Sequence, residues 1–122
     1  MLNKLKALHL RRGEQAENRA EKFLTGKGFT TVVRNYRCKS GEIDLIMEDG
    51  DTLVMVEVRY RKNDTFGSAL ESITPRKQAR IIAAAGHYLA TQHIDRPVRF
   101  DVIGISGNNT LNWVHNAFQA VS

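Results

Sequence analysis

The sequence predicts one α/β domain in which a mixed central β-sheet is flanked by helices, with the elements in the order α-β-β-β-α-β-β. Three observations support this. The 122 residues suit a single domain with one core, two segments have apolar residues at helical spacing, and five others are typical of strands. The composition, 42% hydrophobic and 25% charged, is ordinary for a folded protein.

The first predicted helix covers residues 13–27, where apolar residues form one face and glycines end the run. Residues 1–12 before it are basic, with leucines interspersed. Two interpretations stay open for them: a basic arm that contacts nucleic acid or a partner, or a lead-in to the helix. We expect the domain itself to span residues 13–122.

Three strands and a second helix are predicted next. Residues 29–37 are typical of an edge strand, and residues 42–60 of a β-hairpin around a Glu-Asp-Gly-Asp turn. Residues 61–73 follow as a polar loop. Thr74 is then expected to cap a helix that runs from Pro75 to about residue 92.

The chain is predicted to close with two strands, at residues 98–105 and 110–114. Residues 115–118 are expected to begin a helical turn.

The hairpin carries two carboxylates, Asp44 and Glu57, thirteen positions apart, and Arg59 follows two residues later. Side chains alternate between the faces of a strand, so the hairpin register decides whether the carboxylates meet. A two-residue turn at 49–50 makes them diagonal neighbours, a four-residue loop makes them direct neighbours, and a three-residue loop separates them. Carboxylates on one face can hold a divalent metal for phosphodiester hydrolysis. The alternative is a solvated face on which Glu57 and Arg59 form a surface ion pair.

The same alternation predicts a core on the opposite face of the hairpin. The apolar residues expected there are Ile43, Leu45, Val54, Val56 and Val58.

Charge and composition indicate the class of partner. The net charge of +5 and the pI near 9.7 favour a polyanion, most often nucleic acid. The single cysteine, Cys38, excludes a disulfide framework and a cysteine-based zinc site. No run approaches the length of a membrane span and the N-terminus lacks the apolar stretch of a signal peptide, so we expect a cytoplasmic protein with no membrane partner.

Three cations, Arg76, Lys77 and Arg80, occupy the first two turns of the second predicted helix. Cations there oppose the helix dipole. A phosphate ligand is one explanation, and a solvated charged turn is the other.

Five motifs carry a resemblance to a known family. They are G-x-x-x-E-x-x-A at 13–20, GEIDLI at 41–46, VEVRYR at 56–61, T-x-x-K-Q at 74–78 and RFDV at 99–102. On these motifs the chain resembles, over about residues 13–118, the YraN family of uncharacterised bacterial proteins. It also looks like a member of the PD-(D/E)xK nuclease superfamily, close to archaeal Holliday-junction resolvases. The resemblance implies a restriction-endonuclease-like fold.

The resemblance implies a metal-dependent endonuclease that hydrolyses phosphodiester bonds in DNA, including branched or single-stranded structures. It implies that Asp44, Glu57 and Glu17 bind Mg²⁺ or Mn²⁺ and act in catalysis, with Arg59 in the place of the usual catalytic lysine. A homodimer is also implied, because resolvase relatives make two symmetric cuts. The residues expected to contact nucleic acid are Arg61, Arg76, Lys77, Gln78, Arg80 and Arg99.

Arginine stays protonated at any working pH and cannot act as a base. Three possibilities therefore stay open: Arg59 acts electrostatically, Lys77 supplies the ammonium group, or the site binds without cutting. Two other functions are a non-catalytic nucleic-acid-binding module on the same fold and an interaction protein. The latter would dock through the leucine-rich residues 2–10 and the loop at 61–73.

Overall fold

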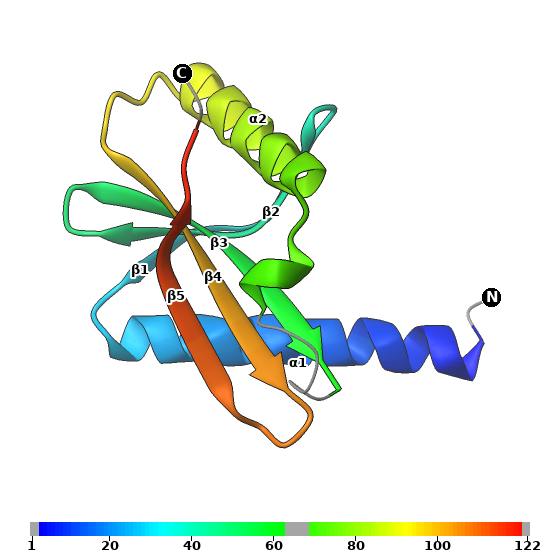
Figure 1. Cartoon of the computed structure of the whole chain (residues 1–122). Helices are drawn as coiled ribbons and strands as arrows, with labels where there is room; N and C mark the ends of the chain where they lie inside the picture. Colours follow the sequence, from blue (N-terminus) through cyan, green and yellow to red (C-terminus); the bar gives the residue numbers. More distant parts are fainter. Residues whose placement is uncertain (1–2, 63–68, 121–122) are drawn as a thin grey trace.

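The computed structural model describes residues 3–62 and 69–120. The helices and strands in chain order are α1 Lys4–Gly26, β1 Thr30–Cys38, β2 Gly41–Asp49, β3 Thr52–Arg61, η1 Leu70–Ser72, α2 Pro75–Thr91, β4 Val98–Ser106 and β5 Leu111–Phe118. One sheet, with strand order β1-β2-β3-β4-β5, lies between α1 and α2 (Figure 1). This arrangement confirms the predicted α/β class and element order.

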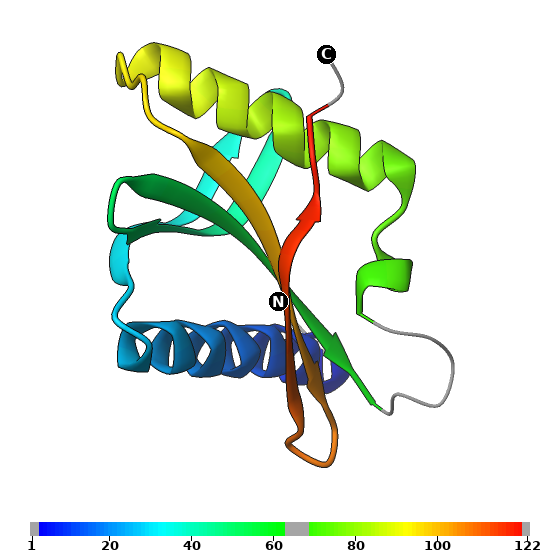
Figure 2. The same cartoon turned by 60° about the vertical axis from the view of Figure 1, so that its left-hand side comes forward.

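The sheet is mixed, as predicted. β3 and β4 run parallel, and the other neighbouring strands are antiparallel. A parallel pair needs a crossover connection, and α2 supplies it. Figure 2 shows α1 and α2 on opposite faces of the sheet. β1 lies at one edge, which confirms the edge strand expected there.

Each helix packs on its own hydrophobic core. Leu53 and Met55 of β3 belong to the core under α2, whereas Val54 and Val56 belong to the core under α1. This confirms the predicted alternation along the strand. The prediction of one core on one face is wrong, because two helices cover the sheet and both of its faces are apolar.

β2 departs from the predicted alternation at Asp44. Leu45 packs under α1, but Ile43, expected on the same face, packs in the core under α2. At Leu45 the strand pairs with both β1 and β3, whereas between Ile43 and Gly41 only β1 pairs with it. The faces of β2 therefore change where the strand loses one of its two neighbours.

Three element bounds differ from the sequence prediction. α1 begins at Lys4 rather than at residue 13, so the described part of the basic segment is helical from there on. β5 continues to Phe118, where the sequence predicts a helical turn, because this ring stacks on Phe100 of β4 at 5.1 Å between centroids. In the predicted loop at 61–73, η1 forms a 3₁₀ turn, and residues 63–68 lie outside the described part of the chain.

α2 begins as predicted. The side-chain oxygen of Thr74 accepts a hydrogen bond from the backbone N of Lys77 at 3.1 Å, and Pro75 occupies the first helical position. This cap fixes the first turn of α2 against the sheet, and that turn carries side chains of the candidate site.

Candidate active site

Asp44 lies at a fork between two strands. Pairing between β2 and β3 ends at Leu45 and Val56, after which β2 pairs only with β1 and β3 continues beside β4. The backbone N of Val58, just beyond the fork on β3, donates to Oδ2 of Asp44 at 2.8 Å. The Asp44 carboxylate thus accepts a hydrogen bond from β3 at a point where β3 no longer pairs with β2. This hydrogen bond holds the carboxylate between the two strands.

The hairpin register is the one expected from a four-residue loop. Ile46 pairs with Met55, as that register requires. Asp49 and Thr52, which would be the ends of a four-residue loop, also pair with each other, so the turn itself is only residues 50–51. Gly50 has a φ of 59°, in the left-handed region that glycine adopts without steric strain. The alternative turn at 49–50 is wrong.

Glu57 is buried on the face of β3 that α2 covers. It is only 5% exposed, so the alternative of a solvated face is wrong. Its Oε1 lies 3.1 Å from Nζ of Lys77 on α2 and 3.9 Å from Nη1 of Arg59. The acidic and basic residues predicted for the site thus meet across the sheet–helix boundary.

Arg59 is positioned by η1. Its Nε donates to Oγ of Ser72 at 3.1 Å, and its Nη2 donates to the Ser72 carbonyl oxygen at 3.2 Å. Ser72 Oγ in turn donates to the carbonyl of Ala69 at 2.6 Å. The two acceptors, both from Ser72, are uncharged, so they position the guanidinium without neutralising it. Its positive charge therefore stays available beside Glu57. Sequence reasoning missed Ser72, because a serine in a polar loop follows no pattern.

The two carboxyl groups at the fork perturb each other. Burial, followed by the negative charge of Glu57, raises the pKa of Asp44 to about 7, and the hydrogen bond from Val58 opposes this. Burial also raises the pKa of Glu57, against the attraction of Lys77 and then Arg59. Both groups can be ionised only at a free-energy cost, since like charges repel strongly in a partly desolvated site.

Glu17 of α1 is near this pair but does not join it. Its Oε1 lies 3.7 Å from Nη2 of Arg34, and the charge of Asp44 is, after burial, the next largest cause that raises the pKa of Glu17. Within residues 3–62 and 69–120, no three Asp, Glu, His or Cys side chains converge closely enough to hold a metal. The structure thus brings Asp44 and Glu57 together and leaves Glu17 outside their immediate contacts.

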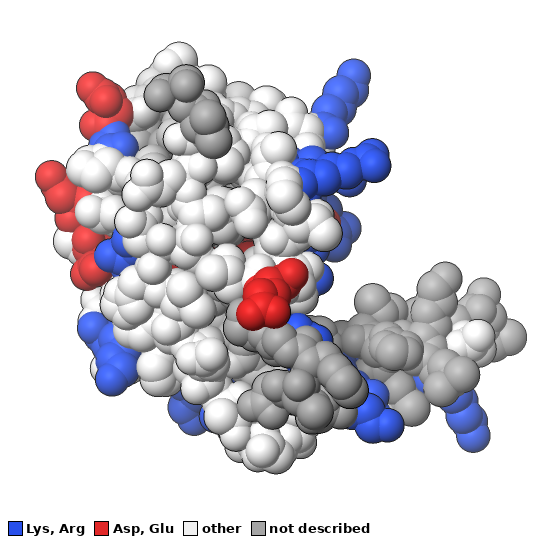
Figure 3. Space-filling model, viewed as in Figure 1, with Lys and Arg blue, Asp and Glu red and all other residues white. Residues whose placement is uncertain are grey.

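A basic cavity of about 420 Å³ opens beside the fork. Lys77 lines it and also contacts Glu57, so the cavity and the carboxylates share one side chain. Basic side chains gather at this edge, where α2 begins on the right of Figure 3. The other lining residues are Arg37, Cys38, Gly41, Glu42, Thr74, Arg76, Arg80 and Ile81.

Gly41, the first residue of β2, lets the strand start directly against α2. A Cβ at this position would lie 2.7 Å from the backbone oxygen of Arg80. Gln78, expected to contact nucleic acid, donates its side-chain amide to the carbonyl of Ile73 at 3.1 Å. The sequence did not single out Arg37, which lines the cavity, because charged residues are common on edge strands that face solvent.

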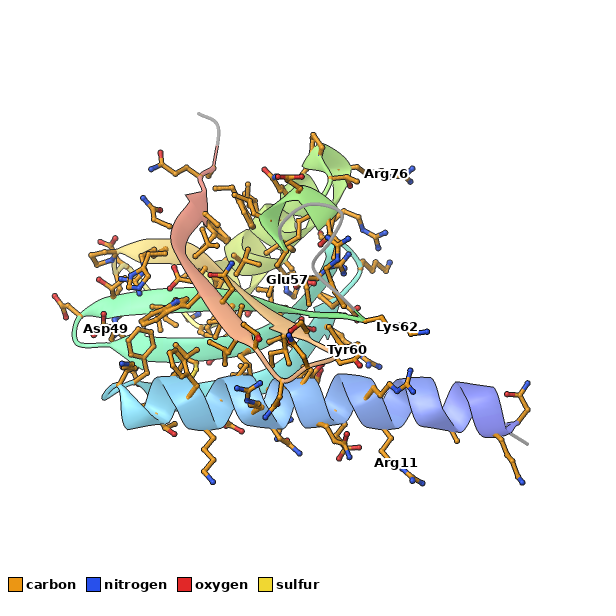
Figure 4. All side chains as sticks on the ribbon, turned by 60° about the horizontal axis from the view of Figure 1, so that its bottom comes forward. Arg11, Asp49, Glu57, Tyr60, Lys62 and Arg76 are labelled. Carbon is orange, nitrogen blue, oxygen red and sulfur yellow. The ribbon has the colours of Figure 1, made fainter. Side chains whose placement is uncertain are left out.

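Arg61 and Arg99 occupy different places. Arg61 ends β3, two residues after Arg59, and so lies at the same end of the sheet as the site. Arg99 pairs in register with Val54, near the opposite end of β3, and its guanidinium donates to both carboxylate oxygens of Asp101 at 2.9 and 3.0 Å. Figure 4 shows Asp49, another partner of Arg99, at the far end of the hairpin from Arg76 and Lys62. The structure does not bring Arg99 to the fork.

The raised pKa of Asp44 predicts a pH-dependent stability. Below the unfolded value of 3.8 the group is protonated in both states, and between that value and about 7 only the unfolded chain ionises. The wild type therefore loses stability as pH rises through this window. We expect Asp44→Asn to exceed the wild type by about 2–4 kcal/mol in free energy of unfolding at pH 8, and by little at pH 4. Urea denaturation at both pH values measures this, and an equal gain at both would contradict the assignment.

None of the helices in the described part of the chain is long and apolar enough to cross a membrane.

Comparisons with known proteins agree on one family. A sequence model described as "Uncharacterised protein family UPF0102" matches residues 16–105. A UPF0102 protein of Nitrosomonas eutropha is 54% identical over 107 residues, which cover 88% of this chain and 92% of that protein. One of Nitrosococcus oceani is 50% identical over 121 residues, or 95% of this chain and 98% of that protein. On the extent and level of these matches, the chain belongs to the uncharacterised protein family UPF0102.

Proposed function

We propose that this protein is a metal-dependent endonuclease that hydrolyses phosphodiester bonds in DNA. One observation carries the proposal: two buried carboxyl groups, Asp44 and Glu57, are held together at the strand fork, where burial raises the pKa of both and the charge of Glu57 raises that of Asp44 further. Such a pair is poorly suited to stabilising the fold. It is suited to a divalent cation, whose charge would favour the ionised form of both groups.

The donor set fits Mg²⁺ or Mn²⁺. Both ions prefer oxygen ligands, and Mg²⁺ is commonly bound through one or two carboxylates together with waters and substrate phosphate. Asp44 and Glu57 would supply the protein ligands, and Glu17 is a candidate for a more distant contact. When bound, the metal supplies Lewis-acid activation of the phosphate and lowers the pKa of a water.

The surrounding cations would bind the phosphate of the substrate. Lys77 and Arg59 flank Glu57, and Arg76 and Arg80 line the neighbouring cavity. Cations at a developing phosphorane favour its extra negative charge. Lys77 is the side chain that can take the role of the superfamily lysine, since Arg59 cannot lose its proton and is already engaged by Ser72. Arg59 then acts electrostatically.

A second function, nucleic-acid binding without cleavage, is favoured by one contact. The ammonium of Lys77 lies 3.1 Å from Glu57 and compensates its charge without any metal. A chain that had lost activity would be stabilised by this pair and would still present the cations of the cavity to phosphates. Binding of this kind weakens steeply with salt.

A cleavage assay separates the two functions. The full chain is incubated with a labelled four-way junction, a flap, single-stranded DNA and duplex DNA, in Mg²⁺, Mn²⁺ or EDTA. We expect cutting in a divalent cation and none in EDTA, and the ranking of substrates gives the preferred structure. Salt-sensitive binding of the same DNAs with no cutting in either metal would overturn the endonuclease proposal and favour the binding module.

A further inference from the structure

A second basic hollow, of about 290 Å³, lies on the face of the sheet that α1 covers. It opens between α1 and the ends of β3 and β4. Figure 4 shows Tyr60 at the end of β3 next to α1, whereas its neighbours Arg59 and Arg61 alternate to the opposite face. The polar lining residues are Arg12, Gln15, Arg19, Tyr60, Ser106 and Asn109.

Arg19 lines this hollow and has one unmatched donor. Its Nη1 is buried and has no hydrogen-bond partner within the described residues. A buried donor without a partner destabilises a fold, and more so when the group is charged. No described residue that lines the hollow is acidic, so the guanidinium lacks a carboxylate there. Arg19 as a whole is only partly buried, so its uncompensated charge can attract an anion into the hollow.

The geometry of α1 adds a second guanidinium. Arg12 and Arg19 are seven residues apart, or two helical turns, and so lie on the same side of α1. Arginine binds phosphate through two parallel hydrogen bonds, which makes it a preferred residue for this anion. Tyr60 is 39% exposed beside them. An exposed aromatic ring next to cations is typical of sites for single-stranded nucleic acid, where bases stack on the ring.

We propose that this hollow binds single-stranded nucleic acid, with a backbone phosphate on Arg12 and Arg19 and a base against Tyr60. The site is separate from the fork and does not depend on cleavage. Free phosphate has the same chemistry as the backbone group but offers no base for Tyr60. The two sources therefore differ in whether the tyrosine contributes.

Binding is measured by fluorescence anisotropy with a labelled single-stranded oligonucleotide, in EDTA and on an Asp44→Asn background that excludes cutting. We expect Arg12→Ala and Arg19→Ala each to weaken binding about 5- to 10-fold, and Tyr60→Leu about fivefold. Arg11→Ala is the charge-matched control, because Arg11 is exposed and points away from the sheet in Figure 4. It should change binding less than twofold.

Two results would overturn the proposal. One is equal binding by the Asp44→Asn protein with and without Arg12→Ala or Tyr60→Leu; both replaced side chains are exposed, so these variants should fold even if Arg19→Ala does not. The other is full competition by millimolar inorganic phosphate with no effect of Tyr60→Leu, which would assign the hollow to free phosphate. The binding assay contains no metal, so its outcome does not depend on cleavage. If the wild type binds single-stranded DNA but never cuts it in the separate assay with Mg²⁺ or Mn²⁺, the endonuclease proposal is refuted and this site stands.

Discussion

Asp44→Asn is expected to lower metal-dependent DNA cleavage by on the order of 10³-fold or more, with the fold intact. The replacement keeps an oxygen that can accept the hydrogen bond from Val58, so the strand fork is preserved. It removes one of the two negative charges that would hold the cation. Because Asp44 destabilises the wild type above neutral pH, the variant should lose activity while it gains stability. A loss caused by unfolding would show the opposite change in stability.

Asp49→Asn is the matched control for this experiment. Asp49 is on the same strand and undergoes the same chemical change, but it lies at the hairpin turn with a side chain 49% exposed. Initial cleavage rates of both variants on the best substrate, with melting curves of the same samples, measure the effect. Cleavage by Asp44→Asn at the wild-type rate would refute the assignment of the fork as the active site.

Asp101→Ala is expected to lower the free energy of unfolding by about 3–5 kcal/mol. Asp101 is fully buried on β4 and accepts four hydrogen bonds. Two come from Arg99, one from Nε1 of Trp113 at 3.0 Å, and one from the backbone N of Asn116 at 2.9 Å. Without the carboxylate these donors lose their common acceptor, and part of the guanidinium is left in a partly buried site without its counter-charge.

Urea denaturation at neutral pH measures this loss, with two reference variants. Asp101→Asn keeps one acceptor oxygen and should fall between the wild type and the alanine variant. Asp95→Ala, at an exposed position in the turn before β4, should stay within about 0.5 kcal/mol of the wild type. Equal stability of Asp101→Ala and Asp95→Ala would show that the hydrogen bonds of Asp101 contribute nothing to the fold.

The environment of Asp101 also explains why the sequence did not reveal the ion pairs of Arg99. A basic residue on a strand of a basic protein is a reasonable candidate to contact nucleic acid. In the fold both carboxylate oxygens of Asp101 face its guanidinium, and Asp49 approaches it at 3.6 Å from the hairpin turn. The partner at residue 49 is distant in sequence, so no local pattern reveals the pairing.

The sequence by itself determined the features that depend on neighbours along the chain. Alternation in β3 predicted the two faces of that strand, and Thr74 with Pro75 predicted the start of α2, because both depend on local backbone geometry. The tertiary structure decided the rest of the site. A hairpin slip of one residue would have parted Asp44 from Glu57, and only the packing of α2 and η1 on the sheet brings Lys77 to Glu57 and Ser72 to Arg59. Register and long-range packing are set by the burial of the whole domain, which no short segment encodes.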